Sequence, residues 1–138
     1  MGNRVIDIYV DGACRGNPGI GAAAILLKDS RGHILHQEGR PLGMTTNNQA
    51  EYYAILFALR EAIRRGIPSI RIHTDSELAA RQINGTYRVK DPTLKKLYEE
   101  VMQLLHAFHH VRVVHVPREE NREADRLANN TIDGMGKR

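Results

Sequence analysis

The sequence predicts an α/β fold in which a five-stranded mixed sheet carries helices on both faces. Three observations support this prediction. The N-terminal third alternates apolar and polar residues with the two-residue period of β-strands. The rest of the chain carries apolar residues at helical spacing, and two short alternating segments interrupt it. Strands joined by turns pair antiparallel and strands separated by helices join through crossovers, so we expect a mixed sheet.

The first three strands are expected at residues 4–11, 22–28 and 33–39. Residues 14–19 (CRGNPG) separate the first two strands and have the composition of a turn, because Gly, Asn and Pro favour tight bends. Residues 29–32 form a second turn signal, so the second and third strands are expected to make a hairpin.

A helix is expected over residues 50–65. Thr46 and Gln49 match a capping box, in which each side chain satisfies a free backbone N–H of the other residue. Gly66 is expected to end the helix, and Pro68 prevents its continuation.

The second half of the chain predicts a strand at residues 69–74, a short helix at 77–83 and a fifth strand at 111–116. Pro92 suits the first turn of a long helix, because its missing N–H would have no partner there. Asn121 is expected to cap a final helix. The apolar stripe of the long helix consists of Leu94, Leu97, Tyr98, Val101, Leu104, Leu105 and Phe108.

Composition favours one domain spanning residues 1–138, with ordinary globular character. Lys and Arg number 20 and Asp and Glu number 16, a net charge of +4 that favours anionic partners such as nucleic acid or acidic lipid headgroups. The longest apolar stretch, residues 19–27, is too short to span a membrane, and no secretory signal is visible. The single cysteine, Cys14, cannot form an internal disulfide. We therefore expect a soluble, cytoplasmic protein with no membrane association.

Four carboxylates occupy unusual positions for surface residues. Asp11 and Asp75 are each expected at the end of a strand, where functional sites gather in α/β sheets. Glu51 and Asp125 lie in register with the apolar faces of their helices. In a sheet where the first and fourth strands are neighbours, all four side chains could meet.

Each carboxylate also has an ordinary structural explanation. Asp11 could open a turn stabilised by its own side chain. Glu51 could complement the helix dipole, Asp75 could cap the short helix, and Asp125 could be a solvated surface residue. These alternatives stay open at the level of the sequence.

A meeting of four carboxylates would require compensation. Two like charges about 4 Å apart repel by about 4 kcal/mol at an effective dielectric constant near 20. Oxygen-only ligands favour hard divalent ions, Mg²⁺ or Mn²⁺, over zinc. In a cationic protein, such a site indicates phosphodiester chemistry.

Four sequence blocks, in order and across nearly the whole chain, resemble the type 1 ribonucleases H. They are YVDGACRGNPG around Asp11, TTNNQAEYYAI around Glu51, HTDSELA around Asp75 and ENREADRLA around Asp125. The resemblance implies the ribonuclease H-like fold and an endonuclease that cuts the RNA strand of RNA–DNA hybrids, leaving 5′-phosphate and 3′-hydroxyl ends.

The resemblance also implies a catalytic and metal-binding role for all four carboxylates. Asp11 would bridge two Mg²⁺ ions, for which Mn²⁺ could substitute. Asp125 would help to hold the ion that carries the attacking water, and Glu51 and Asp75 would complete the other. The residues implied to bind substrate are Cys14, Arg15, Gly16, Asn17, Thr46, Asn47, Asn48 and Arg118. Asn17 and Asn47 could instead serve only as turn residues.

The sequence departs from the family pattern in two main places, with smaller differences at Met44 and Glu77. Many bacterial members carry a Trp- and Lys-rich protrusion, whereas residues 84–91 (NGTYRVKD) are short here and the chain has no Trp. A basic cluster nearby could supply affinity for the substrate or could be a solvated helix face. Arg118 stands in place of a loop histidine and cannot shuttle protons, because it stays protonated. The basic cluster consists of Arg88, Lys90, Lys95 and Lys96.

We weigh three functions. The leading one is a divalent-metal ribonuclease acting on RNA–DNA hybrids, with double-stranded RNA open as a secondary substrate and no obligate protein partner expected. The second is a binding module of the same fold that cleaves poorly, although binding alone does not need four carboxylates. The third is a proofreading exonuclease, which would place an acid two residues after Asp11, where this chain has Ala13.

Overall fold

A computed structural model describes residues 4–135. Five strands form one sheet in the order β3-β2-β1-β4-β5, in which β1, β2 and β3 pair antiparallel and β4 and β5 run parallel to β1. The mixed sheet is therefore confirmed. The strands are β1 (Ile6–Gly16), β2 (Gly19–Lys28), β3 (Ile34–Thr45), β4 (Ser69–Thr74) and β5 (His110–His115), and the helices are α1 (Asn47–Arg64), α2 (Glu77–Ile83), α3 (Pro92–Leu105), a short 3₁₀ turn (Arg118–Glu120) and α4 (Arg122–Met135).

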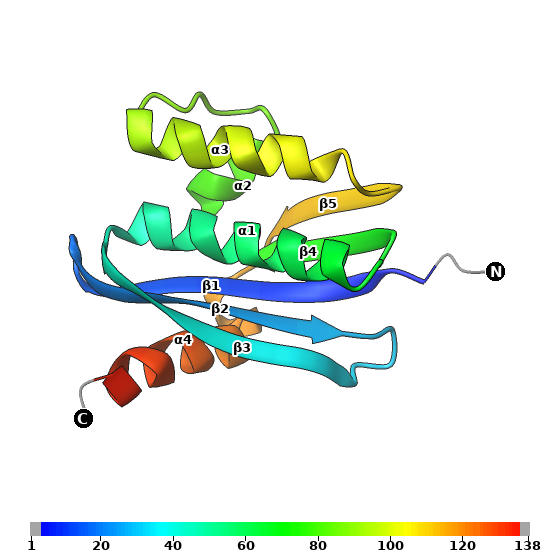
Figure 1. The fold of residues 1–138 in the computed structure, drawn as a ribbon, viewed down its shortest axis with the longest axis horizontal. Coiled ribbons are helices and arrows are strands. Elements are labelled where there is room, and N and C mark those ends of the chain that lie inside the picture. The colour runs from blue at the N-terminus through cyan, green and yellow to red at the C-terminus, as the bar shows by residue number, and fades with distance from the viewer. Residues whose placement is uncertain (1–3, 136–138) are drawn as a thin grey trace.

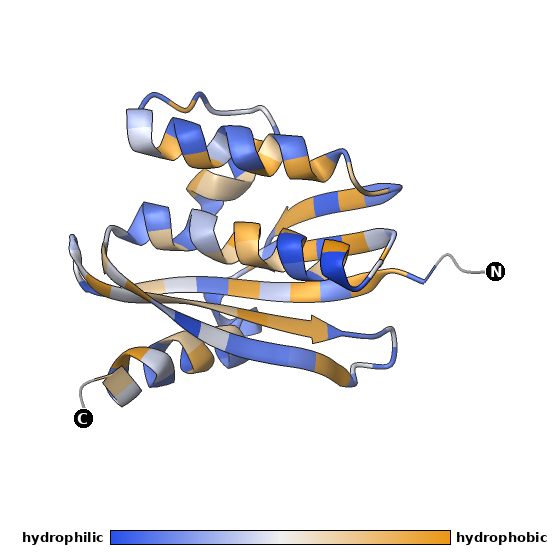
Figure 2. Ribbon diagram, in the orientation of Figure 1, coloured by the Kyte–Doolittle hydropathy of each residue, from blue (hydrophilic) through white to orange (hydrophobic). Residues whose placement is uncertain are grey.

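The helices cover both faces of the sheet, as predicted. Figure 1 shows α1 on one face with α2 and α3 beyond it, and α4 on the opposite face. Residues 22–27 of β2 are buried along their whole length, because α1 and α4 cover this strand from both sides. Figure 2 shows the apolar side of α3 turned toward α1 and α2 and its polar side turned outward. Within residues 4–135, no helix is both long and apolar enough to cross a membrane.

The first three strands extend further than the alternation pattern indicates, and β3 continues to Thr45 where the sequence predicted an end at residue 39. Residues 14–16, expected in a turn, continue β1, and its pairing with β2 runs to Gly16 opposite Gly19. The connecting turn is reduced to Asn17 and Pro18. The prediction was wrong here because glycine and alanine carry no alternation signal, while backbone hydrogen bonds between strands need no side chains.

Helix α1 has the caps that the sequence predicts, but it begins at Asn47 rather than at residue 50, because the capping box places the first helical residue directly after Thr46. The Thr46 hydroxyl accepts a hydrogen bond from the Gln49 backbone N–H at 3.2 Å, and the Gln49 side chain accepts one from the Thr46 N–H at 3.4 Å. The capping box is therefore confirmed. Gly66 follows the helix end with φ of 69°, a conformation that glycine adopts without strain.

Asn121 precedes α4 as expected, but it does not cap the helix with its side chain. Its amide donates a hydrogen bond to the Val10 carbonyl at 2.8 Å. The side chain is nearly fully buried, at 1% exposure, and fastens the start of α4 to β1 one residue before Asp11. The predicted cap was wrong because a tertiary contact takes this side chain. The same contact places the first turn of α4 over the end of β1.

Candidate functional site

Sheet pairing places Asp11 and Asp75 side by side. The parallel pairing of β1 with β4 ends at Val10 opposite Thr74, and each aspartate is the next residue in its chain. Asp11 does not end β1 as the sequence suggested, because β1 continues with Asp11 opposite Ala24 of β2. It is instead the first residue of β1 beyond the edge that β4 shares. Both carboxylates therefore face the space where the two strands part.

Glu51 reaches this space because α1 packs unusually close to β1 at Gly12. The Gly12 backbone N–H donates a hydrogen bond to Glu51 Oε1 at 2.7 Å. A Cβ atom at Gly12 would lie 2.2 Å from the Ala50 carbonyl carbon and 2.4 Å from the Glu51 nitrogen. Only glycine fits this approach, which holds the Glu51 carboxylate beside Asp11.

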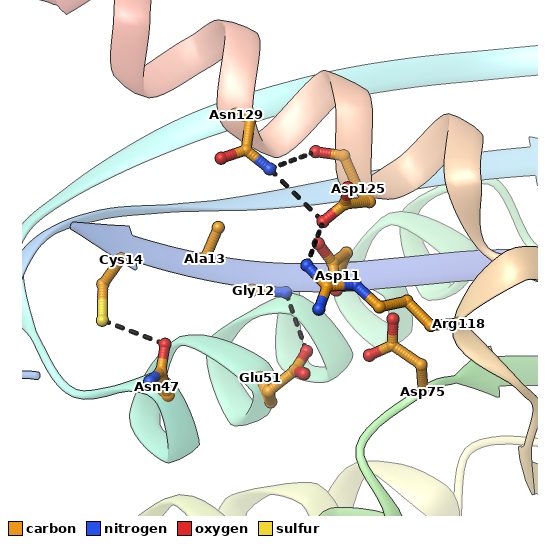
Figure 3. Close-up of a pocket in the computed structure, with 10 residues that line it drawn as sticks. All are labelled: Asp11, Gly12, Ala13, Cys14, Asn47, Glu51, Asp75, Arg118, Asp125 and Asn129. Atoms are coloured by element: carbon orange, nitrogen blue, oxygen red, sulfur yellow. Dashed lines mark hydrogen bonds and ion pairs between the residues drawn. The ribbon is translucent and has the colours of Figure 1, made fainter. Parts of the chain in front are cut away.

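The four predicted carboxylates converge on one pocket of about 390 Å³. Ligand oxygens of Asp11, Glu51 and Asp75 lie within 4.8 Å of one another. Figure 3 shows Asp11 at the centre, with Asp125 of α4 on one side and Glu51 and Asp75 on the other. Arg118 lies across the opening, with its guanidinium 3.9 Å from Asp125 Oδ1. The convergence expected from the sequence is present in the structure.

The ordinary structural explanations account for little of this arrangement. Ser76, and not Asp75, caps α2, since its hydroxyl accepts a hydrogen bond from the Ala79 N–H at 3.1 Å. Asp11 lies inside a strand, so it opens no turn. In the part of the chain that the structure describes, its Oδ2 is buried and has no hydrogen-bond partner. A lone buried carboxylate oxygen is costly unless a ligand satisfies it.

Burial and mutual repulsion make these carboxylates hard to ionise. Burial, together with the neighbouring charges of Glu51, Asp75 and Asp125, raises the pKa of Asp11 to about 10. Burial and the Asp75 charge raise the pKa of Glu51 to about 8, while the hydrogen bond from Gly12 partly opposes that rise. A group of acids that resists ionisation in this way is suited to a positively charged ligand.

The donor set fits hard divalent ions. Asp11, Glu51 and Asp75 offer carboxylate oxygens at close range, and Asp11 Oδ2 is buried with no protein partner among the described residues. Oxygen ligands of this kind suit Mg²⁺ and Mn²⁺. The structure therefore supports a metal centre. The chemistry of the ligands defines the class of the ion, a hard divalent cation.

A second group of His36, Glu38 and Glu61 also brings ligand atoms together. Its charges are already paired, because Arg64 and Arg65 bind Glu61 and Arg40 binds Glu38. These contacts hold the pKa of Glu61 at about 2 and lower that of Glu38. The group is therefore an ion-pair network between β3 and α1, whereas among the described pocket acids only Asp125 lies within ion-pair distance of a cationic side chain, Arg118.

The residues predicted to bind substrate divide into two sets. Cys14, Asn47 and Arg118 line the pocket. The others lie outside it, around the β1–β2 turn and the start of α1: Arg15, Gly16, Asn17, Thr46 and Asn48.

Several of these side chains have structural partners. Asn17 accepts a hydrogen bond from the Asn47 backbone N–H at 3.0 Å, and Thr46 caps α1. Arg15 turns toward α4, where it contacts Asn129 and Asp133. Asn48 is exposed at the surface.

Three pocket residues were not predicted: Gly12, Ala13 and Asn129. Gly12 and Ala13 fall within a block that the sequence analysis used only for its acid. Asn129 lies four residues after Asp125, on the same helical face, and its amide contacts the Asp125 carboxylate at 3.3 Å. That spacing is the one signal in the sequence that could have identified it.

Comparisons with known proteins agree with this geometry. The model of the Reverse transcriptase-like family matches residues 9–131. Ribonuclease HI of Halobacterium salinarum is 40% identical over 93% of this chain and 64% of its own length, so the chain spans less than two thirds of that relative. Ribonuclease H of Methylobacillus flagellatus is 36% identical over 96% of this chain and 95% of its own length.

Two crystal structures are also similar. RNase H1 from Halobacterium salinarum aligns with a TM-score of 0.91 and 39% identity over 94% of this chain and 98% of that one. LC11-RNase H1, crystallised in complex with an RNA/DNA hybrid, aligns with a TM-score of 0.90 and 38% identity over the same shares. These likenesses confirm the ribonuclease H-like fold class.

The close approach at Gly12 can be tested by Gly12→Ala. The added methyl group would overlap the backbone of Ala50, so we expect the free energy of unfolding to fall by about 1–3 kcal/mol, as in other overpacked sites. Urea denaturation measures the change. Gly134→Ala is the matched control, because a Cβ there meets no atom within 4 Å. Equal stability of the two variants would contradict the packing argument.

The raised pKa values predict a pH dependence in the absence of divalent ions. Between about pH 5 and pH 8, Asp11 and Glu51 are deprotonated in the unfolded chain, whereas the folded chain retains their protons, so stability should fall as the pH rises. Groups with a lowered pKa, such as Glu61, change the stability with pH only below this pH range. Thermal melts in EDTA should show this slope for the wild type and a shallower one for Asp11→Asn. Identical slopes would contradict the assignment.

Proposed function

Because the chain belongs to the Reverse transcriptase-like family and, within it, to the type 1 ribonucleases H, we propose that it hydrolyses the RNA strand of RNA–DNA hybrids by internal cleavage. The products would carry 5′-phosphate and 3′-hydroxyl ends. The observation that carries the proposal is the convergence of four carboxylates around an Asp11 oxygen that has no partner among residues 4–135. We further propose that residues 1–138 act as a single catalytic domain.

Four side chains would hold two Mg²⁺ ions: Asp11, Glu51, Asp75 and Asp125, with Mn²⁺ able to substitute. When bound, such ions supply Lewis acidity to both the attacking water and the leaving 3′ oxygen. The chain's own contribution is to hold its ligands in place before substrate arrives. Gly12 fixes Glu51 through a 2.7 Å hydrogen bond, and sheet pairing fixes the backbones of Asp11 and of Thr74, the residue before Asp75.

Arg118 would act on the phosphate. Its side chain is 80% exposed and lies at the pocket opening, beside Asp125. A guanidinium there can bind two phosphate oxygens and offset part of the negative charge that the acids impose on an anionic substrate. It cannot move protons, because it stays protonated. Among the residues that line the described pocket none is a histidine, so we assign no proton shuttle to this chain.

Recognition of the hybrid would take place at the β1–β2 turn and the start of α1. Asn47 and Asn48 are exposed there, and amide groups can both donate to and accept from the 2′-hydroxyls of the minor groove. Asn17 supports this surface from within by binding the Asn47 N–H. We therefore propose direct contacts for Asn47, Asn48 and the backbone of residues 14–16, and a supporting role for Asn17 and Thr46.

A basic groove at the α2–α3 loop would supply further affinity. It has a volume of about 610 Å³, and Tyr87, Arg88, Lys90, Lys95 and Tyr98 are among its lining residues. The buried Gln82 amide donates to the Arg88 carbonyl at 3.2 Å and so holds the loop. Cations beside an exposed aromatic ring, here that of Tyr87, suit a nucleic-acid backbone. We propose that the DNA strand of the hybrid lies along this groove.

The cleavage proposal predicts a strict requirement for divalent ions. End-labelled hybrid, double-stranded RNA and double-stranded DNA would each be incubated with Mg²⁺, Mn²⁺ or EDTA. We expect internal cuts in the RNA strand of the hybrid only when a divalent ion is present. Asp11→Asn should lower the rate more than about 100-fold, since even the partners of metal ligands are worth 10- to 100-fold. Glu99→Gln, at an exposed position on α3, is the control and should cleave normally.

The other outcomes of this assay separate the alternatives. Cleavage in EDTA would contradict the metal centre. Hybrid binding without cleavage in either ion would favour the binding module. Cuts in double-stranded RNA would add a second substrate.

Neutralising the groove should weaken binding without changing the chemical step. The triple variant Arg88→Gln, Lys90→Gln and Lys95→Gln should raise KM with little change in kcat. Each phosphate contact contributes about 0.9 to the salt slope, so the slope should fall by about 2–3. Binding titrations over a range of KCl concentrations measure this. A control triple variant at exposed arginines outside the groove, Arg31→Gln, Arg112→Gln and Arg126→Gln, should keep a steeper slope. Equal slopes would contradict the groove assignment.

A further inference from the structure

Two rows of side chains face each other where α4 crosses the end of β1. Alternate residues of β1 share a face and rise about 6.7 Å per pair, and every fourth residue of a helix shares a face and rises about 6 Å. The two rises are similar, so each side chain of one row lies roughly opposite a side chain of the other row. The rows are Asp11, Ala13 and Arg15 on β1, and Asp125, Asn129 and Asp133 on α4.

The Asn129 amide lies between Asp125 and Arg15 and contacts both of them. Its amide nitrogen lies 2.9 Å from the Asp125 carbonyl and 3.3 Å from Asp125 Oδ1, and Figure 3 shows it turned toward that carboxylate. Its amide oxygen accepts a hydrogen bond from Arg15 at 3.1 Å. The same guanidinium pairs with Asp133 at 2.8 Å. Ala13, which lies between Asp11 and Arg15 in the β1 row, is small enough to leave room for the amide.

The chemistry of the partners fixes which way the amide faces. A guanidinium only donates hydrogen bonds, so Arg15 requires the oxygen of Asn129 on its side. The nitrogen must then face Asp125, whose carboxylate only accepts. A reversed amide would set two donors together at one end and two acceptors together at the other. Arg15, held by Asp133, therefore determines that Asn129 presents a donor to Asp125.

We propose that Asn129 is a positioning residue for Asp125, and that Arg15 acts through Asn129. This inference rests on the proposed function, in which Asp125 holds a divalent ion. The Asp125 side chain is 32% exposed, and its cationic neighbour Arg118 lies 3.9 Å away and is mostly exposed. A carboxylate with few fixed partners can rotate, so one hydrogen bond of defined direction restricts it substantially. The Arg15 guanidinium, which the sequence analysis expects to contact substrate, would therefore also orient the Asn129 amide.

The test compares Asn129→Ala with Asn130→Ala, a neighbouring asparagine on the exposed side of α4. Isothermal titration with Mn²⁺, in the absence of nucleic acid, should show about 10-fold weaker binding for Asn129→Ala and no change for Asn130→Ala, because the partners of metal ligands contribute about 10- to 100-fold. With hybrid, kcat should fall about 10-fold, and KM should change less than twofold. Wild-type Mn²⁺ affinity and kcat in Asn129→Ala would overturn the proposal.

A second variant separates positioning from folding. Alanine favours helices more than asparagine does, so Asn129→Ala should retain its thermal melt. Asn129→Leu keeps the approximate volume of the side chain and removes the donor, so it should show the same loss of Mn²⁺ affinity. A normal affinity in Asn129→Leu would overturn the hydrogen-bond argument and leave only a packing role.

The role of Arg15 is tested by a double-mutant cycle. If Arg15 acts through Asn129, the loss of Mn²⁺ affinity in Arg15→Ala should be small or absent once Asn129 is alanine. Additive losses, or an effect on KM alone, would overturn this part of the proposal. The calorimetry contains no substrate, so failure of the wild type to cleave hybrid would count against the proposed function and leave the positioning result interpretable.

Discussion

Repulsion among four carboxylates is the constraint on which the rest of the described structure depends. Asp11, Glu51, Asp75 and Asp125 would separate if their supports allowed it, because like charges at this range oppose folding. Each is therefore carried by a different element: β1, α1, the end of β4 and α4. The sheet and helices hold the acids together before any ion or substrate binds, which is the arrangement that a preorganised site requires.

Much of the fold could be predicted, since the order of strands and helices follows from periodicity, caps and turns. The bounds of β4 and α2 agree with the sequence prediction to the residue. The end of β1 did not, because residues 12–16 continue the ladder through backbone hydrogen bonds that small side chains do not reveal. Asn121 shows a related limit: its residue type favours a cap, and a contact with Val10, distant in sequence, takes its side chain instead.

The residues of the site also divide into those that the sequence could predict and those that it could not. Acids at strand ends and on apolar helix faces were visible in the sequence, and the structure brings all four to one pocket. Gly12 could not be identified, because its importance lies in the distance between β1 and α1, which no local pattern contains. The Asn129 amide depends on a guanidinium 114 positions away in the chain. The resemblance to the family implied that Thr46 and Arg15 bind substrate, whereas the structure also gives each a partner within the protein.

The connection between β3 and α1 is a single residue, because Thr46 alone separates Thr45 from Asn47. One inserted residue there would turn α1 by about 100° and advance it by about 1.5 Å, carrying Glu51 away from Gly12. Residues 84–91, between α2 and α3, hold none of the four acids, and doubling the length of such a loop costs only about 0.6 kcal/mol. Evolutionary change in chain length, or a segment grafted by an engineer, is therefore best accommodated between α2 and α3.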